Sequence, residues 1–167
     1  APEVTMLSAG GEWDGSGTLL YTNPGDFEAD YTDAIALGAD LSNNSIGTNT
    51  APNGFDCDIT GDYGVMSSLI DAAVLGSLGG DIVVFWANGN ERQTTRCGST
   101  YSTTAPPATA KNHITVGALN ANNDTVTSFT SWGPVDDGRL KPDIAAPGCS
   151  TLGDGGITST SSGGGYS

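Results

Sequence analysis

The chain has 167 residues, enough for one domain with a substantial buried core. It carries 19 acidic and 5 basic residues, a formal net charge of −14, and such a surface would repel nucleic acid and anionic membranes. Its 25 glycines and 14% charged residues indicate a compact, loop-rich protein rather than a helical bundle. No apolar run reaches the length of about 18 residues that spans a bilayer, so no transmembrane helix is predicted.

The first half of the chain predicts strands and helices in alternation, in the order strand 3–8, helix 26–37, strand 39–47, helix 65–78 and strand 82–86. The second helix is expected to stop at Gly79-Gly80. This alternation is typical of an α/β protein with a parallel sheet and right-handed crossovers.

Ligands of parallel sheets bind beyond the carboxyl ends of the strands. That rule selects NNSIG (43–47) and ANGNE (87–91). Gly89 would let the backbone approach a ligand, and a neighbouring asparagine amide could donate to an oxyanion. A hairpin turn at Asn-Gly is the simpler alternative, disfavoured because the following ERQTTRC does not form a strand partner.

The second half predicts a strand over 113–119 and a short strand leading into a turn within TVTSFTSWGP (125–134). A Pro- and Gly-punctuated segment with a brief apolar stretch follows over 136–148. The tail 152–167 is rich in glycine and predicts no packed element.

His113 is the only histidine, so a Ser-His-Asp or Cys-His mechanism would have to use it as the base. It opens a strand and has no nucleophile or carboxylate motif nearby, which favours a surface or edge histidine without a catalytic role. The scattered cysteines do not provide zinc-ligand spacing around it.

Cys57 and Cys97 lie in polar, glycine-containing loops. A Cys57–Cys97 disulfide in a secreted protein is favoured, and two free thiols remain the alternative. Cys149 is then unpaired, or paired outside this chain.

Two acidic loops, DCDITGD (56–62) and VDDGR (135–139), could supply the oxygen ligands of a calcium ion. Neither has EF-hand spacing, and solvated surface charge is the favoured interpretation.

Three segments occur in a distinctive order: ANGNE (87–91), SFTSWGP (128–134) and DGRLKPDIAAPG (137–148). With APEVTML at the start, they resemble the middle of the catalytic domain of subtilisin-like serine proteases, the subtilase family. The resemblance covers nearly the whole chain. It implies a three-layer subtilisin-like parallel sheet with right-handed crossover helices, here incomplete.

The resemblance also implies roles for individual residues. Asn90 matches the oxyanion-hole asparagine, whose amide donates to the tetrahedral intermediate. Residues 45–47 match a segment that pairs with the substrate backbone and forms one wall of the primary specificity pocket, 87–89 match the opposite wall, and Ala105 matches the pocket floor. The implied substrate-binding residues are Ser45, Ile46, Gly47, Ala87, Asn88, Gly89 and Ala105.

Two further positions are informative in this comparison. The Pro106–Pro107 bond matches one that is often cis in the family. Asn88 replaces the usual alanine, which is expected to put a polar group at the pocket edge and leaves the side-chain preference open.

The catalytic triad is absent. The family's aspartate and His-Gly-Thr-His motifs precede the segment that APEVTML resembles, and its Gly-Thr-Ser-Met motif follows the segment that resembles GGGYS. Residues 1–167 therefore correspond to a partial subtilase catalytic domain between the His motif and the Ser motif. His113 matches a structural position, and the chain by itself is expected to be inactive.

The resemblance implies a fragment of a secreted serine endopeptidase that forms an acyl-enzyme on protein or peptide substrates. The chemistry requires no cofactor, and a structural calcium ion remains an expectation. The implied partners are the substrate and the missing parts of the same catalytic domain, with no nucleic acid or membrane. The alternatives are an extracellular module that binds peptides by strand addition along 45–47, or an acidic calcium-dependent structural module.

Overall fold

The computed structural model describes residues 4–8, 12–13, 19–20, 24–48, 50, 54–94, 97–149 and 157. Apart from residue 157, the glycine-rich tail predicted over 152–167 lies outside the described residues, as does Glu3 of the first predicted strand.

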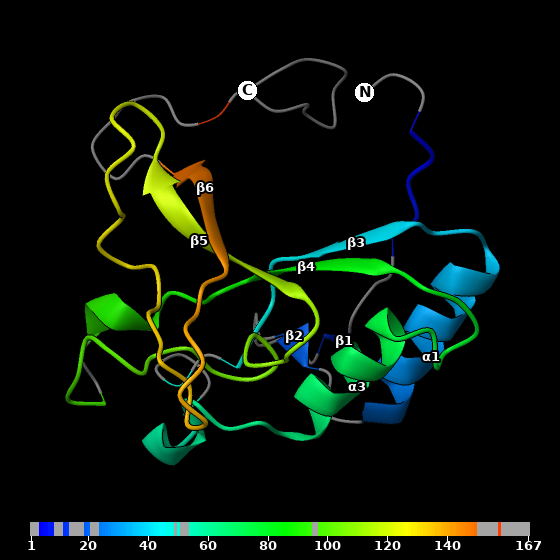
Figure 1. Ribbon diagram of the computed structural model, residues 1–167, viewed down its shortest axis with the longest axis horizontal. Coiled ribbons are helices and arrows are strands. Elements are labelled where there is room, and N and C mark those ends of the chain that lie inside the picture. The colour runs from blue at the N-terminus through cyan, green and yellow to red at the C-terminus, as the bar shows by residue number, and fades with distance from the viewer. Residues whose placement is uncertain are drawn as a thin grey trace.

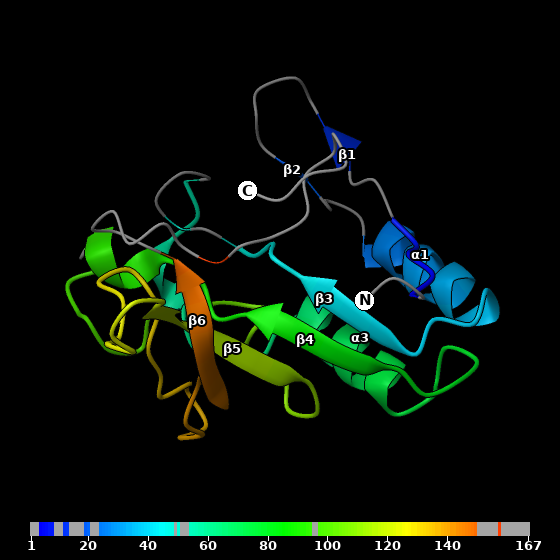
Figure 2. The same cartoon turned by 90° about the horizontal axis from the view of Figure 1, so that it is seen from above.

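The centre of the molecule is a four-stranded parallel sheet in the order β3-β4-β5-β6 (Figures 1 and 2). The strands are β3 (Leu41–Asn44), β4 (Val83–Ala87), β5 (Ile114–Asn120) and β6 (Ile144–Cys149). The parallel α/β architecture is thus confirmed. The brief apolar stretch anticipated in the Pro- and Gly-punctuated segment is a full strand, because it pairs along β5 from Val116↔Ile144 onward.

The N-terminal region differs from the prediction. Residues 4–8 form no strand and are exposed, so the strand predicted there is wrong for the described part. An extended segment becomes a strand only where a neighbour accepts its backbone hydrogen bonds. The turn-rich stretch that follows contains a short antiparallel pair, β1 (Glu12–Trp13) with β2 (Leu19–Leu20).

Helix α1 (Pro24–Ala36) begins two residues before the predicted start, at a proline whose fixed φ suits the first helical turn. It ends at Ala36, and Gly38, two residues later, has φ +88°. Helix α3 (Val65–Val74) stops earlier than predicted because Gly76, and not Gly79, is the first left-handed residue after it, with φ +80°. The described residues also contain two 3₁₀ turns, η1 (Cys57–Ile59) and η2 (Glu91–Thr94).

The hydrophobic core lies between the sheet and the two helices, which pack on one face of it (Figure 1). Phe27 of α1 packs against Trp86 of β4, with ring centroids 5.8 Å apart and the ring planes tilted by 60°. The core residues are Phe27, Tyr31, Ile70, Ala73, Ile82, Val84, Trp86, Ala108 and Ala110.

The opposite face of the sheet is apolar but open. Side chains alternate along β4, so Val83 faces away from buried Val84, and it pairs in register with Leu41. Leu41 is 60% exposed, and Val83 and Ile144 are each 49% exposed. The described residues therefore form two layers of the expected three-layer arrangement.

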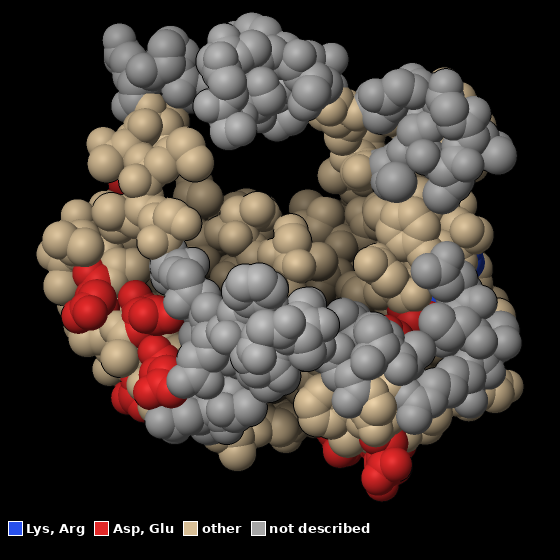
Figure 3. Space-filling view, turned by 180° about the vertical axis from the view of Figure 1, so that it is seen from behind, with Lys and Arg blue, Asp and Glu red and all other residues tan. Residues whose placement is uncertain are grey.

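Acidic side chains dominate the charged surface in Figure 3. Four acidic residues lie on α1, namely Asp26, Glu28, Asp30 and Asp33. Among the described residues, none of the helices is both long and apolar enough to cross a membrane.

Candidate active site

Two neighbouring strands end side by side and bring the predicted pocket walls together. Asn44 of β3 pairs with Trp86 of β4, so 45–47 and 87–89 reach the same edge of the sheet. The Trp86 indole Nε1 donates to the carbonyl of Ile46 at 2.6 Å. This hydrogen bond fixes the first wall, 45–47, to β4, the strand that leads into the second wall, 87–89.

The predicted floor contacts both walls. On one side, the amide N and the Oγ1 of Thr48 donate to the Pro106 carbonyl at 3.2 and 2.6 Å. On the other side, Thr104 Oγ1 donates to Asn88 Oδ1 at 3.0 Å. Ala105, between these contacts, is buried, and the Pro106–Pro107 peptide bond is cis. The structure therefore places the three predicted substrate-binding segments around one site.

Asn88 is not a free polar group at the pocket edge, so that expectation is wrong. The residue is 1% exposed. Its amide nitrogen donates to the Ser131 carbonyl, and its amide oxygen accepts from Thr104. Burial is tolerated because both ends of the amide are satisfied, and Asn88 thereby links the wall to the floor.

Asn90 follows at the turn between β4 and η2, and it is exposed. The turn depends on Gly89, which has φ +96°. A Cβ at this glycine would lie 3.1 Å from Ser131 Oγ. The chain thus presents a neutral amide beside the two walls, and such a donor suits a developing oxyanion because it requires little reorganisation.

Buried contacts hold the far side of this turn. Glu91 is buried, and its Oε2 accepts from Thr50 Oγ1 at 2.5 Å.

Cys57 and Cys97 form a disulfide with a Cα–Cα distance of 5.4 Å. The side chain of Cys149, at the end of β6, lies outside the described part.

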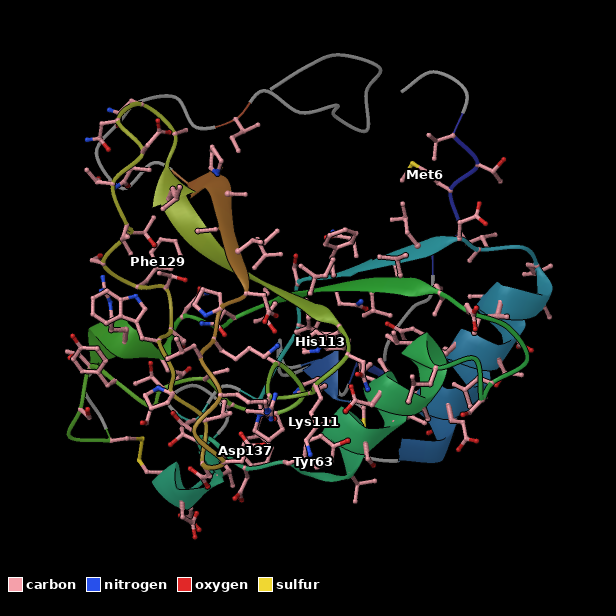
Figure 4. All side chains as sticks on the ribbon, viewed as in Figure 1. Met6, Tyr63, Lys111, His113, Phe129 and Asp137 are labelled. Atoms are coloured by element: carbon pink, nitrogen blue, oxygen red, sulfur yellow. A yellow bond between two sulfur atoms is a disulfide. The ribbon has the colours of Figure 1, made fainter. Side chains whose placement is uncertain are left out.

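His113 is buried rather than at the surface, so that part of the prediction is wrong. Its Nε2 lies 2.8 Å from Thr115 Oγ1, which donates to the Ala108 carbonyl at 3.0 Å. Burial first, and then the positive charge of Lys141, lowers the pKa of His113 to about 4. Enclosed just before β5 (Figure 4), the imidazole is uncharged at neutral pH and its Nε2 contacts Thr115, as expected of a packing residue.

The two acidic loops lie side by side, since the amide of Asp136 donates to the Gly61 carbonyl at 3.2 Å. Asp137 forms an ion pair with Arg139 at 2.8 Å, and this partner lowers the pKa of the Asp137 carboxyl. Within the described ranges, no group of three or more His, Cys, Asp or Glu residues could hold a metal ion.

A family model described as the subtilase family matches residues 1–166. The chain belongs to the subtilase family. The fold and the family inferred from the ANGNE, SFTSWGP and DGRLKPDIAAPG segments are thereby confirmed.

This subtilase chain is 44% identical over 77 residues to serine protease AprX of Bacillus subtilis (strain 168). The match covers 42% of this chain and 16% of that protein. The solved structure of the prenylagaramide maturation protease PagA is similar with a TM-score of 0.57 at 20% identity, covering 90% of this chain and 44% of that one. At this identity the likeness shows the fold alone. The chain spans less than half the length of both relatives.

One residue in contact with the predicted site was not anticipated from the sequence. Ser131 is fully buried and contacts three residues around Asn90, namely Asn88, Gly89 and Glu91. Ser131 lies within the SFTSWGP segment. The sequence around a serine in a polar run does not indicate that it contacts residues some 40 positions away.

Proposed function

We propose that this chain is the part of a secreted serine endopeptidase that carries the substrate cleft and the oxyanion donor, between the family's His and Ser motifs. The observation that supports this is the meeting of 45–47, 87–89, Ala105 and Asn90 at one edge of the sheet. Peptide-bond hydrolysis by an acyl-enzyme needs such a donor beside a side-chain pocket.

In this mechanism the serine of the complete protease attacks the substrate carbonyl carbon. A histidine takes the serine proton and later delivers it to the leaving amine. The Asn90 amide donates to the oxygen as it becomes negative, and an extended substrate pairs with the backbone of 45–47. The reaction requires no cofactor, and this chain contributes binding and charge stabilisation only.

The remaining parts of the catalytic domain are the proposed partner of the open side of the sheet. Leu41, Val83 and Ile144 form an exposed apolar face there. A third layer over this face would bury the apolar surface and bring the nucleophile near Asn90.

A fluorophosphonate probe tests the proposal, because it labels an activated serine stoichiometrically. We expect no labelling of this chain alone and full labelling of the protein encoded by its complete natural reading frame. Heat-denatured protein serves as the control for nonspecific reaction. Labelling of this chain alone would contradict the assignment of the nucleophile to another segment, and an unlabelled complete protein would contradict the protease proposal.

Secretion is supported by the disulfide between Cys57 and Cys97, which persists in oxidising compartments. Detection of the protein in culture medium, with both cysteines resistant to alkylation, is the expected result. A reduced, cell-retained protein would contradict it.

A non-catalytic peptide-binding module is the second candidate. One observation favours it: among the described residues, β3 pairs only with β4, so its other edge is free for strand addition by a peptide. Saturable binding of unstructured peptides by this chain, together with an unlabelled complete protein, would favour this function over hydrolysis.

A structural calcium ion remains a prediction based on the acidic loops. If it is present, chelation should lower the melting temperature, and addition of calcium should restore it. An unchanged melting temperature after chelation would contradict the calcium-dependent structural function.

A further inference from the structure

The residues on both sides of Asn90 are held by one distant segment, 127–132. Ser131 donates its amide N–H to the Gly89 carbonyl at 2.9 Å and accepts the Asn88 amide at its own carbonyl. Its hydroxyl oxygen accepts the backbone N–H of Glu91 at 3.0 Å. One buried serine therefore contacts the two residues before Asn90 and the residue after it.

Arg92 extends these contacts on the far side of the turn. Its Nε donates to the Ser128 carbonyl at 3.0 Å, and its terminal nitrogen donates to the Thr127 carbonyl. Its guanidinium carbon lies 3.9 Å from the centre of the Trp132 ring. Residues 88, 89, 91 and 92 are thus all attached to 127–132, while Asn90 itself is exposed.

The 127–132 segment is itself anchored to rigid structure. Thr127 donates its amide N–H to the Ala118 carbonyl of β5 at 3.1 Å, and Thr130 Oγ1 accepts the Ala118 N–H at 3.1 Å. Thr103 N donates to the Trp132 carbonyl at 2.7 Å. Figure 4 labels Phe129 within this segment, near the end of β5. The segment is therefore fixed to β5 and to the pocket floor, and its own contacts in turn fix the turn around Asn90.

We propose that Ser131 is a positioning residue for the Asn90 oxyanion donor. A side-chain amide aids an oxyanion only when it is aimed in advance, because its reorientation during the reaction would cost the energy it is meant to supply. The Ser131 hydroxyl contributes through Glu91 N–H, which fixes the exit of the turn, while the Ser131 backbone fixes the entry. This inference rests on the proposed function of Asn90.

The experiment uses the protease encoded by the complete natural reading frame and a peptide anilide substrate. Ser131→Ala removes the acceptor for Glu91 N–H and leaves the backbone contacts. We expect kcat to fall by about 10- to 100-fold with KM nearly unchanged, as for a small misplacement of a catalytic group. Asn90→Ala is expected to lower kcat by about 10²–10³-fold, a magnitude adopted from a subtilisin.

A double-mutant cycle separates positioning from general destabilisation. If Ser131 acts through Asn90, Ser131→Ala causes no further loss of kcat in the Asn90→Ala background. Ser67→Ala is the matched control, because Ser67 is also fully buried, its hydroxyl is hydrogen-bonded at 2.8 Å to Thr109, and this side-chain contact does not involve residues 88–92. It should lower stability to a similar degree and leave kcat unchanged.

The outcomes are distinguishable. Additive losses, or an unaffected kcat in Ser131→Ala, would overturn the positioning role while the oxyanion role of Asn90 stands. An unaffected kcat in Asn90→Ala would overturn the proposed function of Asn90, and the inference with it. If Ser131→Ala does not fold, Ser131→Cys carries the same cycle, since its sulfur is a weaker acceptor of similar shape and should give an intermediate kcat.

Discussion

Two asparagines in one short turn have opposite environments. Asn88 is 1% exposed and both ends of its amide are hydrogen-bonded, to Ser131 and Thr104. Asn90, two residues later, is exposed. The same side chain is thus an internal link at one position and solvent-accessible at the other, because burial decides which groups the amide can reach.

Asn88→Ala is expected to destabilise the chain, and Asn90→Ala is not. The first substitution leaves a buried hydroxyl and a buried carbonyl without partners, which costs about 1–3 kcal/mol in the free energy of unfolding. The second alters an exposed residue and should change it by less than about 0.5 kcal/mol. Urea denaturation of both variants measures the difference. Equal losses in the two would contradict this assignment.

At the scale of elements, the junction of β5 with β6 is held by a polar cluster in which Lys141, Thr115 and His113 are buried and Asp143 is exposed. Lys141 Nζ forms an ion pair with Asp143 Oδ2 at 2.6 Å, and Asp143 Oδ2 accepts the Thr115 N–H at 2.8 Å. Burial by itself would raise the pKa of Asp143, but the hydrogen bonds from Lys141 and Thr115 lower it below its ordinary value. His113 completes the cluster through Thr115.

This cluster makes stability depend on pH through His113. Its pKa is about 4 in the folded chain against an ordinary value of 6.5, first because of burial and then because of Lys141. Above pH 6.5 the imidazole is neutral in both the folded and the unfolded chain, so the contribution of His113 to the free energy of unfolding is fully present. As the pH falls towards 4, the unfolded chain binds a proton that the folded chain does not, so the free energy of unfolding decreases by about 3 kcal/mol.

His113→Gln cannot titrate, so its stability should fall less steeply between pH 6.5 and 4. Urea midpoints at half-unit pH intervals compare the two proteins, with Asn90→Ala as a variant that keeps the histidine. Parallel curves for His113→Gln and the natural sequence would show that other groups cause the dependence.

At the scale of the molecule, the disulfide joins two loops that lie 40 residues apart in sequence. Cys57 belongs to η1, and Cys97 follows η2, which begins directly after Asn90. The bridge therefore closes a loop that contains α3, β4 and the second pocket wall. The bridge lowers the conformational entropy of the unfolded chain more than any local contact within that loop could.

Reduction of this bridge should lower the free energy of unfolding by about 3–4 kcal/mol at 25 °C, from the loss of loop-closure entropy. Urea unfolding with and without a reductant measures the effect, and Cys149→Ser, which keeps the bridge, is the control. An unchanged midpoint after complete reduction, verified by thiol titration, would contradict the expectation.

Much of the fold and most of the candidate site were predictable from the sequence. Helices α1 and α3 follow from apolar spacing with Phe27, Tyr31 and Ile70 on the buried face, and the position of 45–47 and 87–91 follows from the rule for parallel strands. The strand predicted over 3–8 is not formed in its described part, 4–8, because an extended segment needs a partner that local pattern does not supply. Likewise, β6 was anticipated only as a brief apolar stretch, because its pairing with β5 is not visible locally.

The sequence by itself determined the α/β order, the family and the place of Asn90, since these depend on periodicity and motif spacing along the chain. Only the tertiary structure decided that Asn88 is buried, that His113 is enclosed and uncharged at neutral pH, and that Ser131 holds the turn around Asn90. The physical reason is common to all three. Burial and hydrogen bonding are set by neighbours that come from distant parts of the chain, and residue type alone does not identify those neighbours.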